Sequence, residues 1–211
     1  EEPIEENLEI CKTYLERMDK IGMTLEIELG ITGGEEDGVD NSDIDVSKLY
    51  TQPEEVGRAY EVLSAVSNRF TIAAAFGNVH GVYKPGNVKL TPVILKNSQE
   101  YVQKKFNTGY NPIDFVFHGG SGSTVEEIRE AISYGVVKMN IDTDTQYAFT
   151  RPIVTHICEN IESVLKIDGE VGVKGKYDPR SYIQLGERGV CDRLKEACDD
   201  LLSTGKSIYK K

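Results

Sequence analysis

Apolar residues recur along the chain at two spacings, and the shorter spacing predicts strands. Residues 23–29 alternate strictly between apolar and polar side chains, so one face of this strand is apolar and the other carries the carboxylates of Glu26 and Glu28. Residues 70–76 form a nearly continuous apolar run, which is typical of a strand buried on both faces of a parallel sheet. Two further strands are predicted at 113–118 and 136–142.

Segments with the helical spacing of apolar residues lie between and after these strands. Helices are predicted at 5–21, 51–66, 93–106 and 123–134, and over most of 146–205 outside 169–180. Thr51 with Glu54, and Ser123 with Glu126, have the spacing of capping boxes that would begin the second and fourth helices. Residues 30–41 are rich in glycine and acidic side chains and are predicted to form a mobile loop.

Strands that alternate with helices predict an α/β fold with a parallel sheet. A complete (β/α)8 TIM barrel takes about 250 residues and eight strands. This chain of 211 residues has only four predicted strands. We therefore expect either a small open sheet or about the second half of a TIM barrel, followed by C-terminal helices.

The chain is acidic, with 35 Asp and Glu against 24 Lys and Arg and a formal net charge of −11. This balance argues against binding to nucleic acid or to an anionic membrane surface. No segment approaches the roughly 20 apolar residues of a transmembrane helix. The four cysteines lack the spacing of a metal site, and the acidic N-terminal residues lack the apolar core of a signal peptide. We therefore expect reduced thiols and a cytoplasmic location.

Polar side chains gather at the C-terminal ends of the predicted strands, where ligands bind in parallel α/β folds. His80 and His118 each follow a strand and precede a glycine, and Glu28 lies near the end of the first strand. Imidazole nitrogens and a carboxylate are a ligand set for Zn²⁺. Histidines with a purely structural role are the alternative. His156 lies within a helical segment and is expected to be a surface residue.

The turn at residues 119–124 is rich in glycine and precedes a helix, an arrangement whose backbone N–H groups suit a phosphate. Residues 140–143 end the next strand, in which Lys138 shares a face with Asn140 and Asp142. Phosphate sites in TIM barrels are frequently built by the loops after strands seven and eight. The strands at 113–118 and 136–142 would then be the seventh and the eighth.

Two further side chains have both a functional and an ordinary interpretation. Glu36, beside Glu35 in the acidic loop, is either a solvated carboxylate or a base carried on a lid that closes over substrate. Arg180 ends the sequence Tyr-Asp-Pro-Arg, which is either an ordinary turn or a phosphate clamp, because a guanidinium group offers paired donors.

Taken together, these segments resemble the zinc-dependent class II fructose-1,6-bisphosphate aldolases. The similarity lies in residues 24–30, 32–41, 76–86, 117–123, 137–144 and 177–180, which read TLEIELG, TGGEEDGVDN, FGNVHGVYKPG, FHGGSGS, VKMNIDTD and YDPR. Their order and spacing fit the family over nearly the whole chain. The resemblance implies a lyase that reversibly cleaves fructose 1,6-bisphosphate into dihydroxyacetone phosphate and glyceraldehyde 3-phosphate in glycolysis and gluconeogenesis.

The resemblance also implies roles for individual residues. Glu28, His80 and His118 would be the zinc ligands. Glu36 would move protons at the dihydroxyacetone phosphate carbon, and Arg180 would reach into a neighbouring subunit to hold the distal phosphate. Dihydroxyacetone phosphate would be bound by Gly81, Gly119, Gly120, Ser121, Asn140, Ile141, Asp142 and Thr143, with Asn140 also catalytic through contact with the substrate oxygens. Backbone carbonyls near His80 and Gly119 would hold a monovalent cation, Na⁺ or K⁺.

The chain departs from the family pattern in one respect. The first half of the family's barrel carries another zinc histidine beside an acid/base aspartate, and no Asp-His pair occurs here. We therefore expect residues 1–211 to be the C-terminal part of a single TIM-barrel domain, inactive without its N-terminal half and working in a homodimer or homotetramer. The alternatives are a tagatose-1,6-bisphosphate aldolase and a non-catalytic fragment that mediates subunit contacts.

Overall fold

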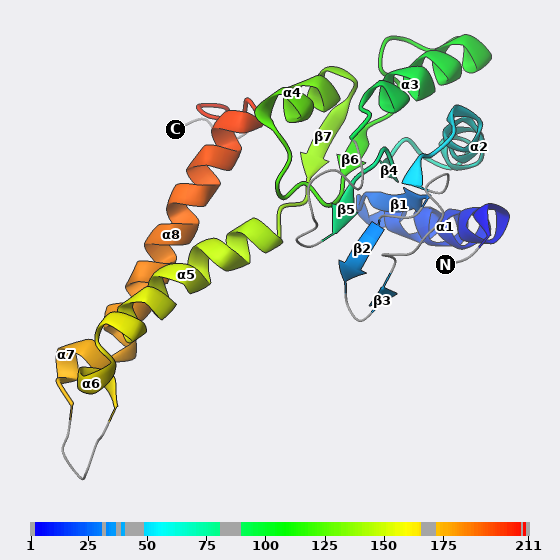
Figure 1. Ribbon diagram of the computed structural model, residues 1–211. Coiled ribbons are helices and arrows are strands. Elements are labelled where there is room, and N and C mark those ends of the chain that lie inside the picture. Colours follow the sequence, from blue (N-terminus) through cyan, green and yellow to red (C-terminus); the bar gives the residue numbers. More distant parts are fainter. Residues whose placement is uncertain are drawn as a thin grey trace. The chain divides into compact units, whose positions relative to one another are not determined.

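The four strands expected from the sequence form one parallel sheet in the computed structural model of the chain (Figure 1). They are β1 (Leu25–Leu29), β4 (Phe70–Ala74), β6 (Phe115–Phe117) and β7 (Val136–Met139), in the order β1-β4-β6-β7. The structure describes residues 3–30, 33–36, 39–40, 49–80, 90–165, 172–207 and 209. The chain divides into two compact units, residues 1–141 and 142–211.

The sheet has one face whose side chains are buried and one face that carries polar groups. β1 shows this most clearly, because Leu25, Ile27 and Leu29 are buried while Glu26 and Glu28 are exposed. The two central strands, β4 and β6, are buried along almost their whole length, as expected for strands covered on both sides. The alternation predicted for residues 23–29 is therefore confirmed over β1, whereas Met23 lies before the strand and is 51% exposed.

Helices of the first unit pack against the sheet and against each other. They are α1 (Ile4–Met18), followed by the short 3₁₀ helix η1 (Asp19–Ile21), then α2 (Pro53–Ser64), α3 (Val93–Phe106) and α4 (Val125–Ser133). α1 contacts β1 and α2, α2 also contacts α3 and β4, and α4 contacts β7. The stripe Leu8, Cys11 and Leu15 on α1 is buried, as its spacing predicts. The helices α1, α2 and α4 thus cover strands that are near them in the chain.

The capping boxes were predicted one residue too early. α2 is capped by Gln52 with Glu55, not by Thr51 with Glu54. Thr51 is buried, and its hydroxyl donates to the Leu29 carbonyl at 2.7 Å and accepts from the Ala75 N–H at 2.8 Å. The hydroxyl is therefore committed to the ends of β1 and β4, and the next residue provides the cap.

The same offset occurs at α4, where Thr124 and Glu127 form the box in place of Ser123 and Glu126. The Glu127 N–H donates to the Thr124 hydroxyl at 3.2 Å, and the Thr124 N–H donates to the Glu127 carboxylate at 2.9 Å. The Ser123 N–H is instead used in the preceding turn, donating to the Gly120 carbonyl at 3.3 Å.

Part of the segment predicted as a mobile loop is paired β structure, so that prediction is wrong for these residues. β2 (Gly33–Glu36) pairs antiparallel with β3 (Val39–Asp40) and parallel with β5 (Val79–His80). The Cα partners are Gly34 with His80 and Glu36 with Val39. Two residues proposed for function, His80 and Glu36, therefore lie on neighbouring short strands. Their side chains lie outside the described part of the structure.

The second unit is mostly helical, as predicted. It contains α5 (Thr143–Glu159), α6 (Ile161–Val164), α7 (Lys174–Tyr177) and α8 (Pro179–Asp200). However, α7 and the start of α8 lie within residues 169–180, which were predicted to interrupt the helices. α5 and α8 lie side by side along most of their length (Figure 1). An ion pair between Arg193 of α8 and Asp144 of α5, at 3.3 Å, links them. Among the described residues, no helix combines the length and the apolar content that crossing a membrane requires.

Candidate metal and substrate site

The polar face of β1 and the end of β6 bring a histidine between two carboxylates. His118 directly follows β6, and its side chain is 15% exposed. Its Nε2 lies 2.8 Å from Oε1 of Glu26, and its Nδ1 lies 3.8 Å from Oε1 of Glu28. Both ring nitrogens therefore face a carboxylate. The structure brings Glu28 and His118 together, as the sequence led us to expect, and their role as metal ligands stays a prediction.

Glu26 has a second partner across the sheet. Its Oε2 accepts a hydrogen bond of 2.7 Å from Nζ of Lys138, which lies on β7. Burial alone would raise the pKa of Glu26, but the hydrogen bonds from Lys138 and His118 outweigh burial and leave this pKa below its ordinary value. Glu26 is therefore ionised at neutral pH, and each of its oxygens accepts a hydrogen bond.

The remaining candidate ligand and the candidate base can be placed only by their backbone. His80 lies on β5 and Glu36 on β2, and their side chains lie outside the described part of the structure, as does all of Gly81. Within the described residues, no group of three His, Cys, Asp or Glu side chains has the arrangement of a metal site. The predicted three-ligand set is thus represented here by Glu28 and His118 alone.

The glycine-rich turn after β6 is hydrogen-bonded to the residue that follows β7. Gly120 donates its N–H to the Asn140 carbonyl at 3.1 Å, and Asn140 donates its own to the Phe117 carbonyl at 2.8 Å. A Cβ at Gly120 would overlap the Met139 side chain and lie 3.1 Å from the Asn140 carbonyl oxygen. Gly119 has a φ of +60°, which glycine adopts without strain. Two segments predicted to bind phosphate are therefore neighbours.

This arrangement limits which groups of the turn can meet an anion. The N–H of Gly120 is used within the protein, so a phosphate would depend on other donors of residues 119–122 and on the start of α4. Ile141 is half-buried and ends the first unit. Phosphate binding by Gly119, Gly120, Ser121 and Asn140 stays a prediction.

Asp142 and Thr143 begin the second unit. The Asp142 carboxylate accepts a hydrogen bond of 2.9 Å from the Gln146 side chain, and its carbonyl accepts one of 2.6 Å from the Thr145 hydroxyl. Both bonds hold the residue at the start of α5. The sequence predicted Asp142 as the last residue of a strand over 136–142, but β7 ends at Met139 and Asp142 lies at the N-terminus of α5, where Gln146 four residues later bonds to it.

Arg180 lies in the first turn of α8, so the Tyr-Asp-Pro-Arg sequence is a helix start. Asp178 caps this helix, accepting from the Arg180 N–H at 3.0 Å, and Pro179 is its first residue. The guanidinium group also donates to both oxygens of Asp178, at 2.9 and 2.5 Å. The side-chain hydrogen bond from Arg180, with the backbone bond second, lowers the pKa of Asp178 to about 2. Arg180 is 81% exposed, and its contact with a phosphate stays a prediction.

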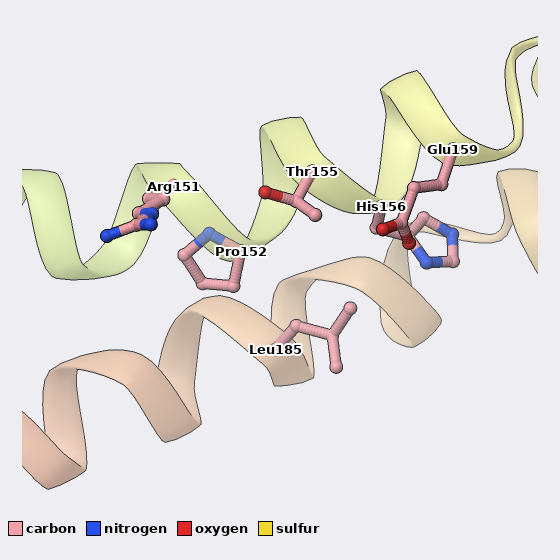
Figure 2. A pocket seen from close by; sticks show the side chains of 6 residues that line it. All are labelled: Arg151, Pro152, Thr155, His156, Glu159 and Leu185. Carbon is pink, nitrogen blue, oxygen red and sulfur yellow. The ribbon is translucent and has the colours of Figure 1, made fainter.

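His156 lies on α5, as its sequence context predicted. Its Nε2 lies 2.9 Å from the Lys176 carbonyl oxygen. It also lines an open pocket of about 420 Å³ between α5 and α8, shown in Figure 2 with Arg151, Pro152, Thr155, Glu159 and Leu185. The pocket combines one acidic and one basic side chain with the polar Thr155 and His156 and the apolar Pro152 and Leu185. None of the predicted zinc or substrate residues lines it.

Two residues of this site were not given a role by sequence reasoning. Glu26 was recognised only as a carboxylate on the same face as Glu28, and Lys138 only as a neighbour of Asn140. The period of two along each strand placed both on the polar face. The sequence could not predict that the side chains of Glu26 and Lys138 contact each other, because β1 and β7 lie at opposite edges of the sheet.

Comparison with known proteins identifies the class to which this architecture and site belong. Residues 1–206 match the family model of class-II fructose-bisphosphate aldolase, and the chain belongs to this family. A fructose-bisphosphate aldolase of Edwardsiella ictaluri is 61% identical over 209 residues, covering 95% of this chain and 58% of the relative. A fructose-bisphosphate aldolase class 2 of Escherichia coli K12 is 59% identical, covering 95% of this chain and 57% of the relative.

Solved structures agree with this assignment. The crystal structure of a fructose-bisphosphate aldolase from Campylobacter jejuni matches with a TM-score of 0.81 at 50% identity, covering 98% of this chain and 59% of that one. A putative fructose-1,6-bisphosphate aldolase from Coccidioides immitis matches with a TM-score of 0.64 at 27% identity, covering 97% of this chain and 61% of that one. The chain thus spans about three fifths of the length of these relatives.

Proposed function

We propose that this chain forms the C-terminal part of a class II aldolase that reversibly cleaves fructose 1,6-bisphosphate into dihydroxyacetone phosphate and glyceraldehyde 3-phosphate. The observation that carries this proposal is the approach of His118 to Glu28 on the polar face of the sheet, at 3.8 Å, in a chain of this family. The names of the similar proteins favour the fructose epimer over tagatose 1,6-bisphosphate.

The described donors fit a zinc ion. His118 turns one nitrogen toward Glu28, and an imidazole nitrogen with a carboxylate oxygen is a donor pair that Zn²⁺ uses in catalytic sites. His80 would be the third ligand from this chain. When bound, the ion supplies a Lewis acid.

The chain's own residues would share the remaining tasks. Glu36 moves a proton at the reacting carbon of dihydroxyacetone phosphate, and Asn140 contacts the substrate oxygens. The turn at residues 119–121 and the segment 140–143 hold the phosphate, together with Gly81. Backbone carbonyls near His80 and Gly119 hold a Na⁺ or K⁺ ion. In a homodimer or homotetramer, Arg180 reaches into a neighbouring subunit and binds the distal phosphate of the substrate held there.

We further propose that the parallel sheet is the second half of a (β/α)8 barrel within one domain, in a cytoplasmic enzyme of glycolysis and gluconeogenesis. The coverage of about three fifths of the relatives supports this placement. So do the edges of the sheet at β1 and β7, with which no further strand of the described residues pairs, and where closure of a barrel would add strands.

Zinc content tests the metal part of the proposal. In the full-length enzyme that contains this chain, His118→Asn and Glu28→Gln should each weaken zinc binding and lower the release of triose phosphate from fructose 1,6-bisphosphate. His156→Asn is the matched control, because His156 bonds to the Lys176 carbonyl within the second unit, and it should leave zinc content unchanged. Wild-type zinc affinity in His118→Asn would contradict the proposal.

A further inference from the structure

We infer that Glu26 and Lys138 are positioning residues, which hold the imidazole of His118 with Nε2 carrying the proton and Nδ1 presented to a metal ion beside Glu28. The inference rests on the proposed function, because it concerns the same metal site. It assigns a task to two side chains that belong to neither the proposed ligand set nor the proposed substrate contacts.

The first step concerns the proton on the imidazole ring. A neutral imidazole has one N–H group and one nitrogen lone pair. An ionised carboxylate can only accept, so Glu26 at 2.8 Å from Nε2 selects the form in which Nε2 carries the hydrogen. The lone pair then lies on Nδ1, the nitrogen that faces Glu28. A carboxylate on the outer nitrogen of a metal-binding histidine is a recurrent means of fixing ring orientation.

The second step asks whether Nδ1 and Glu28 are close enough to share an ion. Zinc–nitrogen and zinc–oxygen bonds are about 2.0–2.2 Å long, so two ligands of one zinc ion lie no more than about 4.4 Å apart. The 3.8 Å between Nδ1 of His118 and Oε1 of Glu28 satisfies this limit. The ring orientation fixed by Glu26 is therefore compatible with a shared ion.

The third step concerns Lys138. It donates to the second oxygen of Glu26 at 2.7 Å and fixes the rotation of that carboxylate. The Lys138 side chain is 53% exposed and that of His118 only 15%, so solvent competes with the bond from Lys138 more than with the bond from His118. Lys138 therefore supports the position of Glu26, and removing it should have a smaller effect than removing Glu26 itself.

The same contacts explain why Glu28, not Glu26, is the better candidate ligand. Both residues lie on the polar face of β1, two positions apart. Both oxygens of Glu26 are engaged, one with His118 and one with Lys138. A metal bond to either oxygen would compete with the hydrogen bond already on that oxygen, and it would weaken the hold on the ring or on Glu26 itself.

The test measures zinc affinity in the full-length enzyme by competition with a chromogenic chelator. Glu26→Ala should weaken zinc binding by about 10–100-fold, the usual effect of removing such a partner. Glu26→Gln should rescue part of this loss, because its amide oxygen can still accept from Nε2. Lys138→Met should weaken binding by a smaller factor. Glu5→Gln and Lys105→Met, which break ion pairs elsewhere in the first unit, are matched controls and should leave the affinity at its wild-type value.

A second measurement reports on the ring itself. In the metal-free enzyme at about pH 8.5, where an ordinary imidazole is neutral, the ¹⁵N shifts of His118 should show a hydrogen on Nε2. The Glu26→Ala variant should show a mixture of both forms. The His118→Asn spectrum assigns the signals. A purely structural ion pair would change thermal stability and leave zinc affinity and these shifts as they are.

The outcomes separate this inference from the proposed function. If the wild type binds zinc and both Glu26→Ala and Glu26→Gln bind it with wild-type affinity, the inference is overturned and the proposed function still stands. A hydrogen on Nδ1 of wild-type His118 would do the same. Failure of the wild-type enzyme to bind zinc at all would overturn both.

Discussion

Glu26 and Glu28 lie two residues apart on the same face of β1, yet their surroundings give them different chemistry. Glu26 is held by His118 and Lys138 and has a lowered pKa, whereas Glu28 faces the other nitrogen of His118 at a longer distance. The strand places both carboxylates on one face, and the residues opposite give each of them different partners. Glu26→Gln and Glu28→Gln should therefore differ in their effects on zinc binding.

Glu36 is the residue on which proton transfer is expected to depend. In the full-length enzyme, Glu36→Ala should lower kcat by about 10²–10⁴-fold, the usual contribution of a general acid or base, and leave zinc binding intact because Glu36 is not a proposed ligand. The measurement is kcat together with proton exchange at the dihydroxyacetone phosphate carbon. Glu35→Ala, which removes the neighbouring charge, is the control. Unchanged proton exchange in Glu36→Ala would remove Glu36 from the mechanism.

Asp178 provides a prediction about pH at the residue that caps α8. Its pKa is lowered from 3.8 to about 2, so its carboxylate stays ionised well below the usual range. A lowered pKa in the folded state means that the cap and the Arg180 pair stabilise the helix above about pH 4, and that this stabilisation is lost as the pH falls toward about 2. Titration of the Asp178 carboxyl group, followed through its carbon signal by NMR, should give a midpoint of about 2.

Removing the cause should restore the ordinary behaviour of this carboxyl group. In the Arg180→Met variant the Asp178 midpoint should move back toward 3.8, because the bidentate hydrogen bonds are gone. Glu5, whose pKa is lowered by its hydrogen bond from Arg58 in the first unit, is the control, and its midpoint should be the same in both proteins. An unchanged Asp178 midpoint in Arg180→Met would show that the guanidinium group is not the cause.

At the scale of elements, the close packing between the turn after β6 and the end of β7 gives a stability prediction. Gly120→Ala should lower the free energy of unfolding by about 1–3 kcal/mol, the usual cost of overpacking, because the added methyl group meets Met139 and the Asn140 carbonyl. Chemical denaturation of the full-length enzyme measures this. Gly109→Ala is the matched control, since a Cβ added there would meet nothing within 4 Å. Equal unfolding free energies for the two variants would contradict the prediction.

The sequence predicted those elements whose side chains show a clear period. β1 alternates, β4 is a continuous apolar run, and α1 has a buried stripe, so all three were placed to within a few residues. The caps of α2 and α4 were displaced by one residue because two adjacent hydroxyl or amide side chains could serve, and only tertiary contacts such as that of Thr51 with β1 decide between them.

Two features lay beyond sequence reasoning for a different reason. The short strands β2 and β5 have glycine or too few residues to show a period, and their pairing joins positions 34 and 80. The bond between Lys138 and Glu26 joins residues 112 apart in the chain. Such contacts depend on the tertiary arrangement of the strands, which cannot be predicted from a local sequence pattern. The proximity of Glu28 and His118 was predictable only because parallel strands end at one edge.

At the scale of the whole molecule, the open edges of the sheet lead to a prediction about activity. Purified residues 1–211 with added Zn²⁺ should not cleave fructose 1,6-bisphosphate, because no strand in the described part of the chain pairs with the outer edges of β1 and β7, and the family's Asp-His pair is absent. The measurement is triose phosphate release. Turnover within tenfold of the about 10 s⁻¹ of a typical enzyme would show that the catalytic residues have been misplaced. Recovery on adding the N-terminal segment would support the proposed half barrel.

The order of the strands also bears on how the sheet is built. After β1, each strand of this sheet pairs with the strand of the same sheet that precedes it in the chain, so no later strand is inserted between two that are already joined. The chain segments that join paired strands differ little in the entropic cost of loop closure. Phe115 pairs with Val136, 21 residues on, and Leu25 with Phe70, 45 residues on, a doubling that costs only about 0.6 kcal/mol. The sheet can therefore grow by addition at one edge as the polypeptide leaves the ribosome, without opening any pair already formed.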